Sequence, residues 1–190
     1  GAKSVNPDVT MDIMYTNSWN DPTVESQVAK ALIDRGCDVI SQHSDSTAPA
    51  TTAEENGVWQ VGYNNDMIDA APNASLISPR IDWGIYVTEA VQAMIDGEEI
   101  PVDWCKGLSD GAVYLSPLNE SIAAEGTQEA IDEAAEKIES GELHVFAGPL
   151  KGVSPDGEEY EVPEGEYYHE QEDASAPSWL YIIDGCNVVE

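Results

Sequence analysis

Residues 21–40 read Asp-Pro-Thr-Val-Glu-Ser-Gln-Val-Ala-Lys-Ala-Leu-Ile-Asp-Arg-Gly-Cys-Asp-Val-Ile, and this stretch decides the fold class. Asp21 followed by Pro22 is typical of a helix start, because an aspartate accepts backbone N–H groups there and proline fits the first helical position. Apolar residues then recur at helical spacing along one face, at Val24, Val28, Ala31 and Leu32. Gly36 suits the end of the helix, and the apolar residues after it predict a strand at 37–40.

A strand is also predicted ahead of this helix, at residues 9–15, where apolar side chains alternate. Strand, helix and strand predict a βαβ unit, which almost always forms a right-handed crossover in a parallel sheet. The alternation continues, with helices expected at 47–56, 85–95 and 127–139 and strands at 58–63, 74–77 and 112–115. The predicted fold is therefore α/β with a doubly wound parallel sheet. Farther along, residues 154–176 predict a long acidic loop or hairpin, and residues 179–183 a last short strand.

The composition argues against several partners. The chain has 190 residues, with 7 Lys+Arg against 37 Asp+Glu and a formal net charge of −30. Binding to a nucleic acid polymer or to anionic lipid heads needs clustered basic residues, so neither partner is expected. The hydrophobic fraction of 42% is enough for a packed core.

Motifs for metals, cofactors and catalysis are missing from the sequence. No GxGxxG, P-loop or HExxH motif occurs, and Cys37, Cys105 and Cys186 form no CxxC pair. No metal, cofactor or catalytic residue is therefore expected. Three cysteines permit at most one internal disulfide, and the sequence leaves open whether one forms. The sequence contains no apolar run of about 18 residues, so no transmembrane helix is predicted.

Ligands of doubly wound sheets bind beyond the carboxyl ends of the strands. This rule points to the segments after the predicted strands, at residues 16–21, 41–49, 64–67 and 78–83. The densest polar cluster among them is His43-Ser44-Asp45-Ser46. Three interpretations stay open: a polar loop that caps the next helix, a ligand-binding loop, and a hydrolase that uses His43 and Asp45. No GxSxG motif surrounds either serine.

Two tryptophans and an acidic turn are further candidates. Trp19 and Trp83 lie in strand-end segments, where an aromatic face either stacks on a flat conjugated ligand or packs on the sheet edge. Asp66 follows Asn64 and Asn65, and its carboxylate is able to accept hydrogen bonds from ligand hydroxyl or N–H groups. Asn-Asn-Asp is equally good turn chemistry, so both interpretations of Asp66 stay open.

Six segments resemble those of the basic membrane protein family, which comprises solute-binding lipoproteins of ABC transporters, several of them receptors for purine nucleosides or bases. In chain order they are Tyr15-Thr16-Asn17-Ser18-Trp19-Asn20-Asp21-Pro22, Gly36-Cys37-Asp38-Val39-Ile40 followed by Gln42-His43-Ser44-Asp45-Ser46, Gly62-Tyr63-Asn64-Asn65-Asp66-Met67, Ser78 to Tyr86 with Trp83-Gly84, Gly107-Leu108-Ser109-Asp110-Gly111, and Phe146-Ala147-Gly148-Pro149-Leu150. Each segment alone is weak, but six in the right order are specific, and together they span nearly the whole chain.

This resemblance implies a type I periplasmic-binding-protein fold, which is Rossmann-like and has two lobes hinged around a central cleft. Members are roughly twice as long as this chain, and Gly1-Ala2-Lys3-Ser4-Val5-Asn6-Pro7 resembles a mid-chain segment. We therefore expect a C-terminal portion that lacks most of the first lobe. Residues 1–117 are expected to form the second lobe. Residues 118–190 are expected to form a crossover helix, an acidic loop and a terminal segment that returns towards the first lobe.

The resemblance also implies a function and a set of ligand-binding residues. Trp19 would stack on a purine face or close the cleft, Asp66 would accept hydrogen bonds from the ligand, and the predicted set is Trp19, His43, Asp45, Ser46, Asn65, Asp66 and Trp83. The expected function is solute binding for an ABC importer, with a nucleoside or nucleobase as ligand and a membrane permease as partner. The expected location is the extracellular face of the membrane or the periplasm, with a lipid anchor outside this chain. The alternatives are a nucleoside hydrolase using His43 and Asp45, and a surface interaction domain without a small ligand.

Overall fold

The computed structural model describes residues 1–169 and 176–189 and confirms the α/β class. The chain folds into two compact units, which we call unit 1 (residues 1–13, 83–112 and 132–189) and unit 2 (residues 14–82 and 113–131). In chain order the elements are α1 (Ala2–Val5), β1 (Met11–Ile13), α2 (Pro22–Asp34), β2 (Val39–Ser41), α3 (Ala48–Asn56), β3 (Trp59–Val61), β4 (Ser75–Ile77), β5 (Pro79–Ile81), α4 (Trp83–Asp96), a 3₁₀ turn (Leu108–Asp110), β6 (Val113–Leu115), α5 (Thr127–Glu139), β7 (Leu150–Val153), β8 (Glu159–Val162), β9 (Ile182–Ile183) and β10 (Cys186–Val188). The predicted division of the chain at residue 117 concerns the lobes of a longer receptor and stays a prediction.

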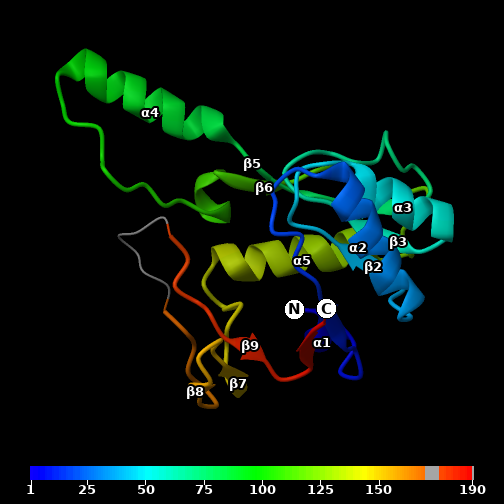
Figure 1. The fold of residues 1–190 in the computed structure, drawn as a ribbon. Helices are drawn as coiled ribbons and strands as arrows, with labels where there is room; N and C mark the ends of the chain where they lie inside the picture. Colours follow the sequence, from blue (N-terminus) through cyan, green and yellow to red (C-terminus); the bar gives the residue numbers. More distant parts are fainter. Residues whose placement is uncertain (170–175, 190) are drawn as a thin grey trace. The chain divides into compact units, whose positions relative to one another are not determined.

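Unit 2 contains the parallel sheet that the sequence predicts. Its strand order is β2-β3-β4, and both strand pairs run parallel. The β2–α3–β3 segment is a βαβ unit, and α2 and α3 lie side by side against this sheet (Figure 1). The carboxyl ends of β2 and β3 therefore meet at one edge, where a ligand site is expected.

Helix α2 begins and ends as its sequence predicts. The side chain of Asp21 accepts hydrogen bonds from the backbone N–H groups of Thr23 and Val24, and Pro22 occupies the first helical position. Gly36, just beyond the helix end, adopts a φ of +104°, a conformation that glycine reaches without a steric penalty. These local signals fix where the helix starts and therefore which of its side chains face the sheet.

The core of unit 2 is small and built mostly from alanine. Small side chains allow α2 and α3 to approach the sheet and each other closely, and the few large ones fill what remains. The fully buried members are Ala29, Ile40, Ala50, Ala53, Met67, Ala71 and Ala74, with Leu32, Ile33, Cys37 and Val58 packed against them.

The prediction that the first strand joins the sheet of residues 37–40 is wrong. In unit 1, β1 pairs in parallel with β10, with Met11 opposite Cys186 and Ile13 opposite Val188. The predicted strand at 112–115 forms as β6, but it runs antiparallel to β5, a strand that the sequence did not predict. Alternation of apolar residues identifies a strand, but it does not identify the strand that completes its hydrogen-bond ladder.

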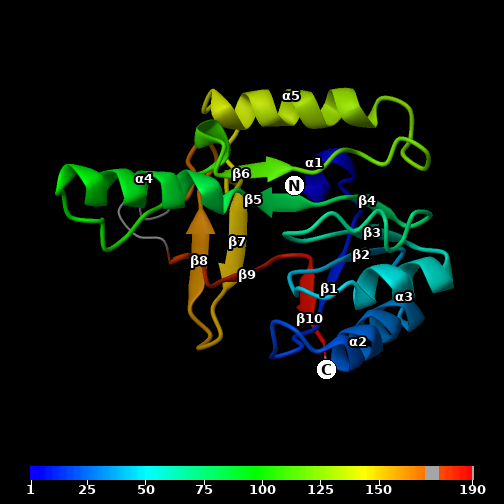
Figure 2. The same ribbon diagram turned by 90° about the horizontal axis from the view of Figure 1, so that it is seen from above.

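Unit 1 also contains a small antiparallel sheet of order β8-β7-β9 (Figure 2). The β7–β8 hairpin begins at Leu150, ahead of the segment 154–176 that the sequence predicts as a long acidic loop or hairpin, and overlaps only the start of that segment, of which residues 170–175 lie outside the described part. Five aromatic rings pack on one another beside it: Phe146, Tyr160, Tyr168, Trp179 and Tyr181.

Helices α4 and α5 confirm the predicted helices at 85–95 and 127–139. Within residues 1–169 and 176–189, no helix has both the length and the apolar character needed to cross a bilayer.

Gly62 offers a test of close packing at the end of β3. A Cβ at this position would lie 2.1 Å from the Oγ atom of Ser78 and 3.3 Å from Cγ of Met67. We expect Gly62→Ala to lower the free energy of unfolding by about 1–3 kcal/mol, the usual cost of overpacking a core. Urea denaturation followed by circular dichroism measures this change.

Ser78→Ala provides the matched rescue. The Ser78 hydroxyl is buried and has no hydrogen-bond partner in the part of the chain that the structure describes, so its removal alone should change stability by less than about 1 kcal/mol. The double variant should recover part of the loss of Gly62→Ala. Equal instability of the single and double variants would show that the hydroxyl is not what the added methyl group meets.

Candidate solute-binding site

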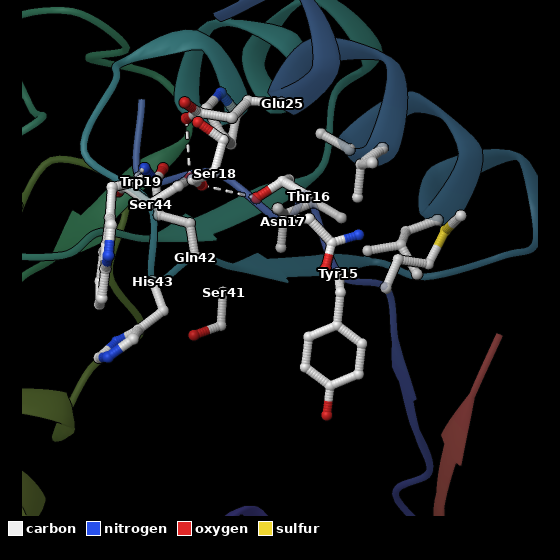
Figure 3. Close-up of a pocket in the computed structure, with 16 residues that line it drawn as sticks. Tyr15, Thr16, Asn17, Ser18, Trp19, Glu25, Ser41, Gln42, His43 and Ser44 are labelled. Carbon is white, nitrogen blue, oxygen red and sulfur yellow. Dashed lines mark hydrogen bonds between the residues drawn. The ribbon is translucent and has the colours of Figure 1, made fainter. Parts of the chain in front are cut away.

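A cavity of about 420 Å³ opens in unit 2 beside the carboxyl end of β2. It is lined by the loop before α2, an apolar face of α2, the end of β2 and the loop after β2 (Figure 3). Its lining residues are Met14, Tyr15, Thr16, Asn17, Ser18, Trp19, Glu25, Val28, Ala29, Leu32, Ile40, Ser41, Gln42, His43, Ser44 and Pro49. This volume and this mixture of aromatic, aliphatic and hydroxyl groups suit a small polar organic ligand.

The loop before α2 is shaped by its own polar groups. The hydroxyl of Thr16 donates to the carbonyl of Ser18 over 2.9 Å, and the backbone N–H of Asn20 donates to the hydroxyl of Ser18 over 3.3 Å. Asn17 adopts a φ of +53°, in the left-handed region that asparagine tolerates better than most residues. This local turn leaves Trp19 with 63% of its surface exposed.

Three aromatic rings follow one another along the sheet edge. The ring centroids of Trp19 and His43 lie 5.9 Å apart, and those of His43 and Tyr63 lie 4.1 Å apart. Figure 3 shows Trp19 and His43 on one side of the cavity and Tyr15 on the other, with Ser41 between them. We call Trp19, His43 and Tyr63 the aromatic wall; the exposed rings of Trp19 and His43 can stack on a flat ligand, and the half-buried Tyr63 packs behind His43.

Among the described residues, Glu25 is the one acidic residue in the cavity lining, and it is only 1% exposed. Its Oε2 atom accepts hydrogen bonds from the hydroxyls of Ser44, over 2.7 Å, and Ser46, over 2.6 Å. Its Oε1 atom accepts from the backbone N–H of Asp21 over 2.8 Å. Burial by itself raises the pKa of Glu25, but the hydrogen bonds from Ser46, Ser44 and Asp21 outweigh burial, and the pKa is lowered. The carboxylate is therefore ionised at neutral pH and already occupied by protein donors.

Two glutamines, Gln42 and Gln60, hold the loop after β2 in place through hydrogen bonds. The Nε2 atom of Gln42 donates to the carbonyls of Ser44 and Ser46, over 2.9 Å and 2.8 Å. Its Oε1 atom accepts from Nε2 of Gln60, a fully buried residue of β3, over 2.8 Å. The loop after β2 is therefore held through both its hydroxyl and its carbonyl groups.

The seven predicted ligand-binding residues all lie in the described part of the chain, and Trp19 and His43 line the cavity. Asp45 is exposed, and its backbone N–H donates to the carbonyl of Trp19 over 2.7 Å, which ties the two loops together. The hydroxyl of Ser46 donates to Glu25. The structure thus brings Trp19, His43, Asp45 and Ser46 to one place.

Asn65 and Asp66 lie in the loop after β3, next to Tyr63 of the aromatic wall. The Oδ1 atom of Asp66 accepts from the backbone N–H of Ile68 over 3.0 Å, the arrangement of an Asx turn. Asn65 is exposed. Trp83 is the first residue of α4 and belongs to unit 1, whereas the cavity belongs to unit 2.

Sequence reasoning missed Glu25 and Gln42 as parts of the site, and it used Tyr63 only as part of a motif. A signal for Glu25 was present, because it lies on the face of α2 that also carries Val28 and Ala29. A carboxylate on an apolar helical face calls for buried hydrogen-bond donors. Within residues 1–169 and 176–189, no group of three or more His, Cys, Asp or Glu side chains is arranged to hold a metal ion.

The sequence of the chain is similar to those of known proteins. Residues 1–145 match the family model described as Bmp, the PnrA-like ABC transporter substrate-binding proteins. The chain belongs to the Bmp family. This Bmp chain is 38% identical over 160 residues to a curated relative, a purine-binding protein of Brucella abortus. The match covers 84% of this chain and 45% of the relative. The chain is 36% identical over 149 residues to a putative ABC transporter glucose-binding protein of Haloferax volcanii, covering 78% and 38%.

Solved structures agree with the fold of this Bmp chain. An ABC transporter solute-binding protein of Conexibacter woesei superposes with a TM-score of 0.59 at 20% identity, covering 76% of this chain and 49% of that protein. A transcriptional activator of the comK gene from Bacillus halodurans gives 0.60 at 17% identity, covering 69% and 47%. The Bmp chain thus spans less than half the length of each of these relatives, and it shares their type I periplasmic fold.

The lowered pKa of Glu25 predicts how stability depends on pH. A carboxylate whose folded-state pKa lies below its ordinary value of 4.5 stabilises the fold fully above that value, and this contribution is lost as the pH falls through the lower folded pKa. At pH 7 the wild-type chain should exceed Glu25→Gln by about 2 kcal/mol in unfolding free energy, the scale of a buried hydrogen bond to a charged group. Urea denaturation between pH 7 and 3 should show this difference shrinking below pH 4.5. A difference that stays constant with pH would contradict the prediction.

Proposed function

We propose that this chain carries part of the binding site of an ABC importer's solute-binding protein, and that the solute is a small polar aromatic molecule. The cavity beside the aromatic wall is the observation that supports this, because it combines stackable rings with hydroxyl and amide groups at the carboxyl end of a parallel sheet. Membership of the Bmp family supports the transport role.

A purine nucleoside or nucleobase is the ligand that we favour. Stacking of a base on an aromatic side chain contributes about 1–3 kcal/mol, and Trp19 offers an exposed face for it. Thr16, Asn17 and Ser41 carry groups that both donate and accept hydrogen bonds, as sugar hydroxyls and ring N–H groups require. The name of the Brucella abortus relative supports a purine, whereas that of the Haloferax volcanii relative makes glucose the sugar to test against it.

The remaining parts of the proposal concern the receptor as a whole. We propose that a membrane permease receives the solute and that the receptor works in the periplasm or on the outer face of the membrane, held there by a lipid anchor. Residues 1–117 would supply most of the second lobe, and residues 118–190 would return towards the first. This chain covers only 38–49% of the length of its relatives, and this supports a receptor with two lobes.

A calorimetric screen tests the ligand class. Adenosine, guanosine, inosine, their free bases, uridine and glucose are titrated into the full product of the gene and into the 190-residue chain. We expect heat of binding from at least one purine compound and none from glucose. If no purine or pyrimidine compound gave a heat of binding, the ligand proposal would be refuted. Release of free base during incubation would instead favour a nucleoside hydrolase.

Trp19→Ala tests the stacking role, and Trp59→Ala is its matched control. Trp59 is also partly exposed, at 43%, but it begins β3 and is thus at the opposite end of the strand from the aromatic wall. Loss of one stacking contact should raise the dissociation constant of the purine ligand by roughly 5- to 150-fold for Trp19→Ala. Trp59→Ala should leave it unchanged. Equal affinities of wild type and Trp19→Ala would remove this residue from the site.

A further inference from the structure

Glu25 stands out because a buried carboxylate needs several donors, and here the donors come from the binding loop. It lies in the first turn of α2, yet two of its partners, Ser44 and Ser46, belong to the segment after β2. The third, the N–H of Asp21, belongs to the loop that ends at the start of α2. One buried group thus joins the two loops that border the cavity.

The positions of its partners give this link a direct effect on the aromatic wall. Ser44 follows His43 in the chain, and Ser44 and Ser46 flank Asp45. The backbone N–H of Asp45 donates to the carbonyl of Trp19 over 2.7 Å, so fixing the two serines also fixes the loop that carries Trp19. The hydrogen bonds to Glu25 are therefore connected, through this loop, to both the Trp19 and the His43 rings, whose centroids lie 5.9 Å apart.

The same hydrogen bonds keep Glu25 away from a solute. Its two oxygens accept from two hydroxyls and a backbone N–H, and the side chain is 1% exposed. Two other acidic residues near the wall, the exposed Asp45 and the half-buried Asp66, are not among the residues that line the cavity. A cation in the cavity would find no uncommitted carboxylate among the lining residues that the structure describes.

We propose that Glu25 is a positioning residue: it sets the spacing of the aromatic wall through Ser44 and Ser46 and does not contact the solute. The inference builds on the function proposed above and adds to it a preference for neutral over cationic solutes. Because the hydroxyl of Ser46 is directed to Glu25, Ser46 acts through this carboxylate as well.

The hydrogen-exchange rate of the Asp45 amide reports on the geometry of the loop after β2, and its measurement needs no ligand. In wild type, the hydrogen bond to Trp19 should protect this amide. Glu25→Gln, Ser44→Ala and Ser46→Ala should each lower its protection by roughly tenfold or more. The two serine variants keep the measurement decisive should Glu25→Gln not fold. Unchanged protection in the folded variants would overturn the proposal even if no solute is ever found.

Glu54→Gln is the matched control. Glu54 also ties a helix to a loop of unit 2, because its Oε1 atom accepts from the backbone N–H of Asn73 over 2.9 Å, but it lies outside the cavity lining. This variant should keep the protection of the Asp45 amide at the wild-type level. A loss equal to that of Glu25→Gln would show that any weakening of unit 2 opens the loop.

Solute titration then separates positioning from contact. With the purine ligand found by calorimetry, Glu25→Gln and Ser46→Ala should weaken binding by a similar factor, roughly tenfold, in step with the loss of Asp45 protection. Weaker binding with full protection of the Asp45 amide would mean that the side chain touches the solute, and the proposal would be wrong. A cationic solute that binds wild type better than its neutral analogue would also overturn it.

Discussion

The parallel register of β2 and β3 is the constraint on which the site depends. Ser41 lies opposite Val61, and the N–H of Gln42 extends the ladder by donating to the carbonyl of Val61 over 3.3 Å. Two residues past the last paired position, His43 and Tyr63 are therefore neighbours, and their rings are in contact. A shift of one residue in this pairing would turn these side chains to opposite faces of the sheet.

Several buried polar groups of unit 2 form a connected series, whereas Oε1 of Gln60 and the hydroxyls of Ser75 and Ser78 have no hydrogen-bond partner among the described residues. Gln60 donates to Gln42, Gln42 donates to the carbonyls of the loop after β2, and hydroxyls of that loop donate to Glu25. Because an unsatisfied buried polar group costs more than the net gain of a hydrogen bond, each member makes the next one tolerable. The alanine-rich core supplies few large apolar contacts, so this network contributes specificity that packing alone does not.

The net charge of −30 and the cavity fit together physically. Negative charge at this density repels polyanions at long range, but it hardly affects a neutral molecule. Among the described lining residues the one carboxylate, Glu25, is ionised, and its oxygens are already occupied by hydrogen bonds from the protein. An acidic surface around such a pocket is compatible with the neutral solute proposed above.

The sequence by itself determined helices α2 to α5, the strands β2, β3 and β4, the family, and two residues of the cavity, Trp19 and His43. These follow from local rules: the Asp21-Pro22 start, the four-residue apolar repeat of α2, and polar clusters directly after apolar strands. Tertiary structure alone decided that β1 pairs with β10 and that Glu25 binds serines 19 and 21 residues away. Local periodicity tells which face of an element is buried, whereas a hydrogen-bond ladder and the donors of a buried carboxylate come from distant segments that only folding brings together.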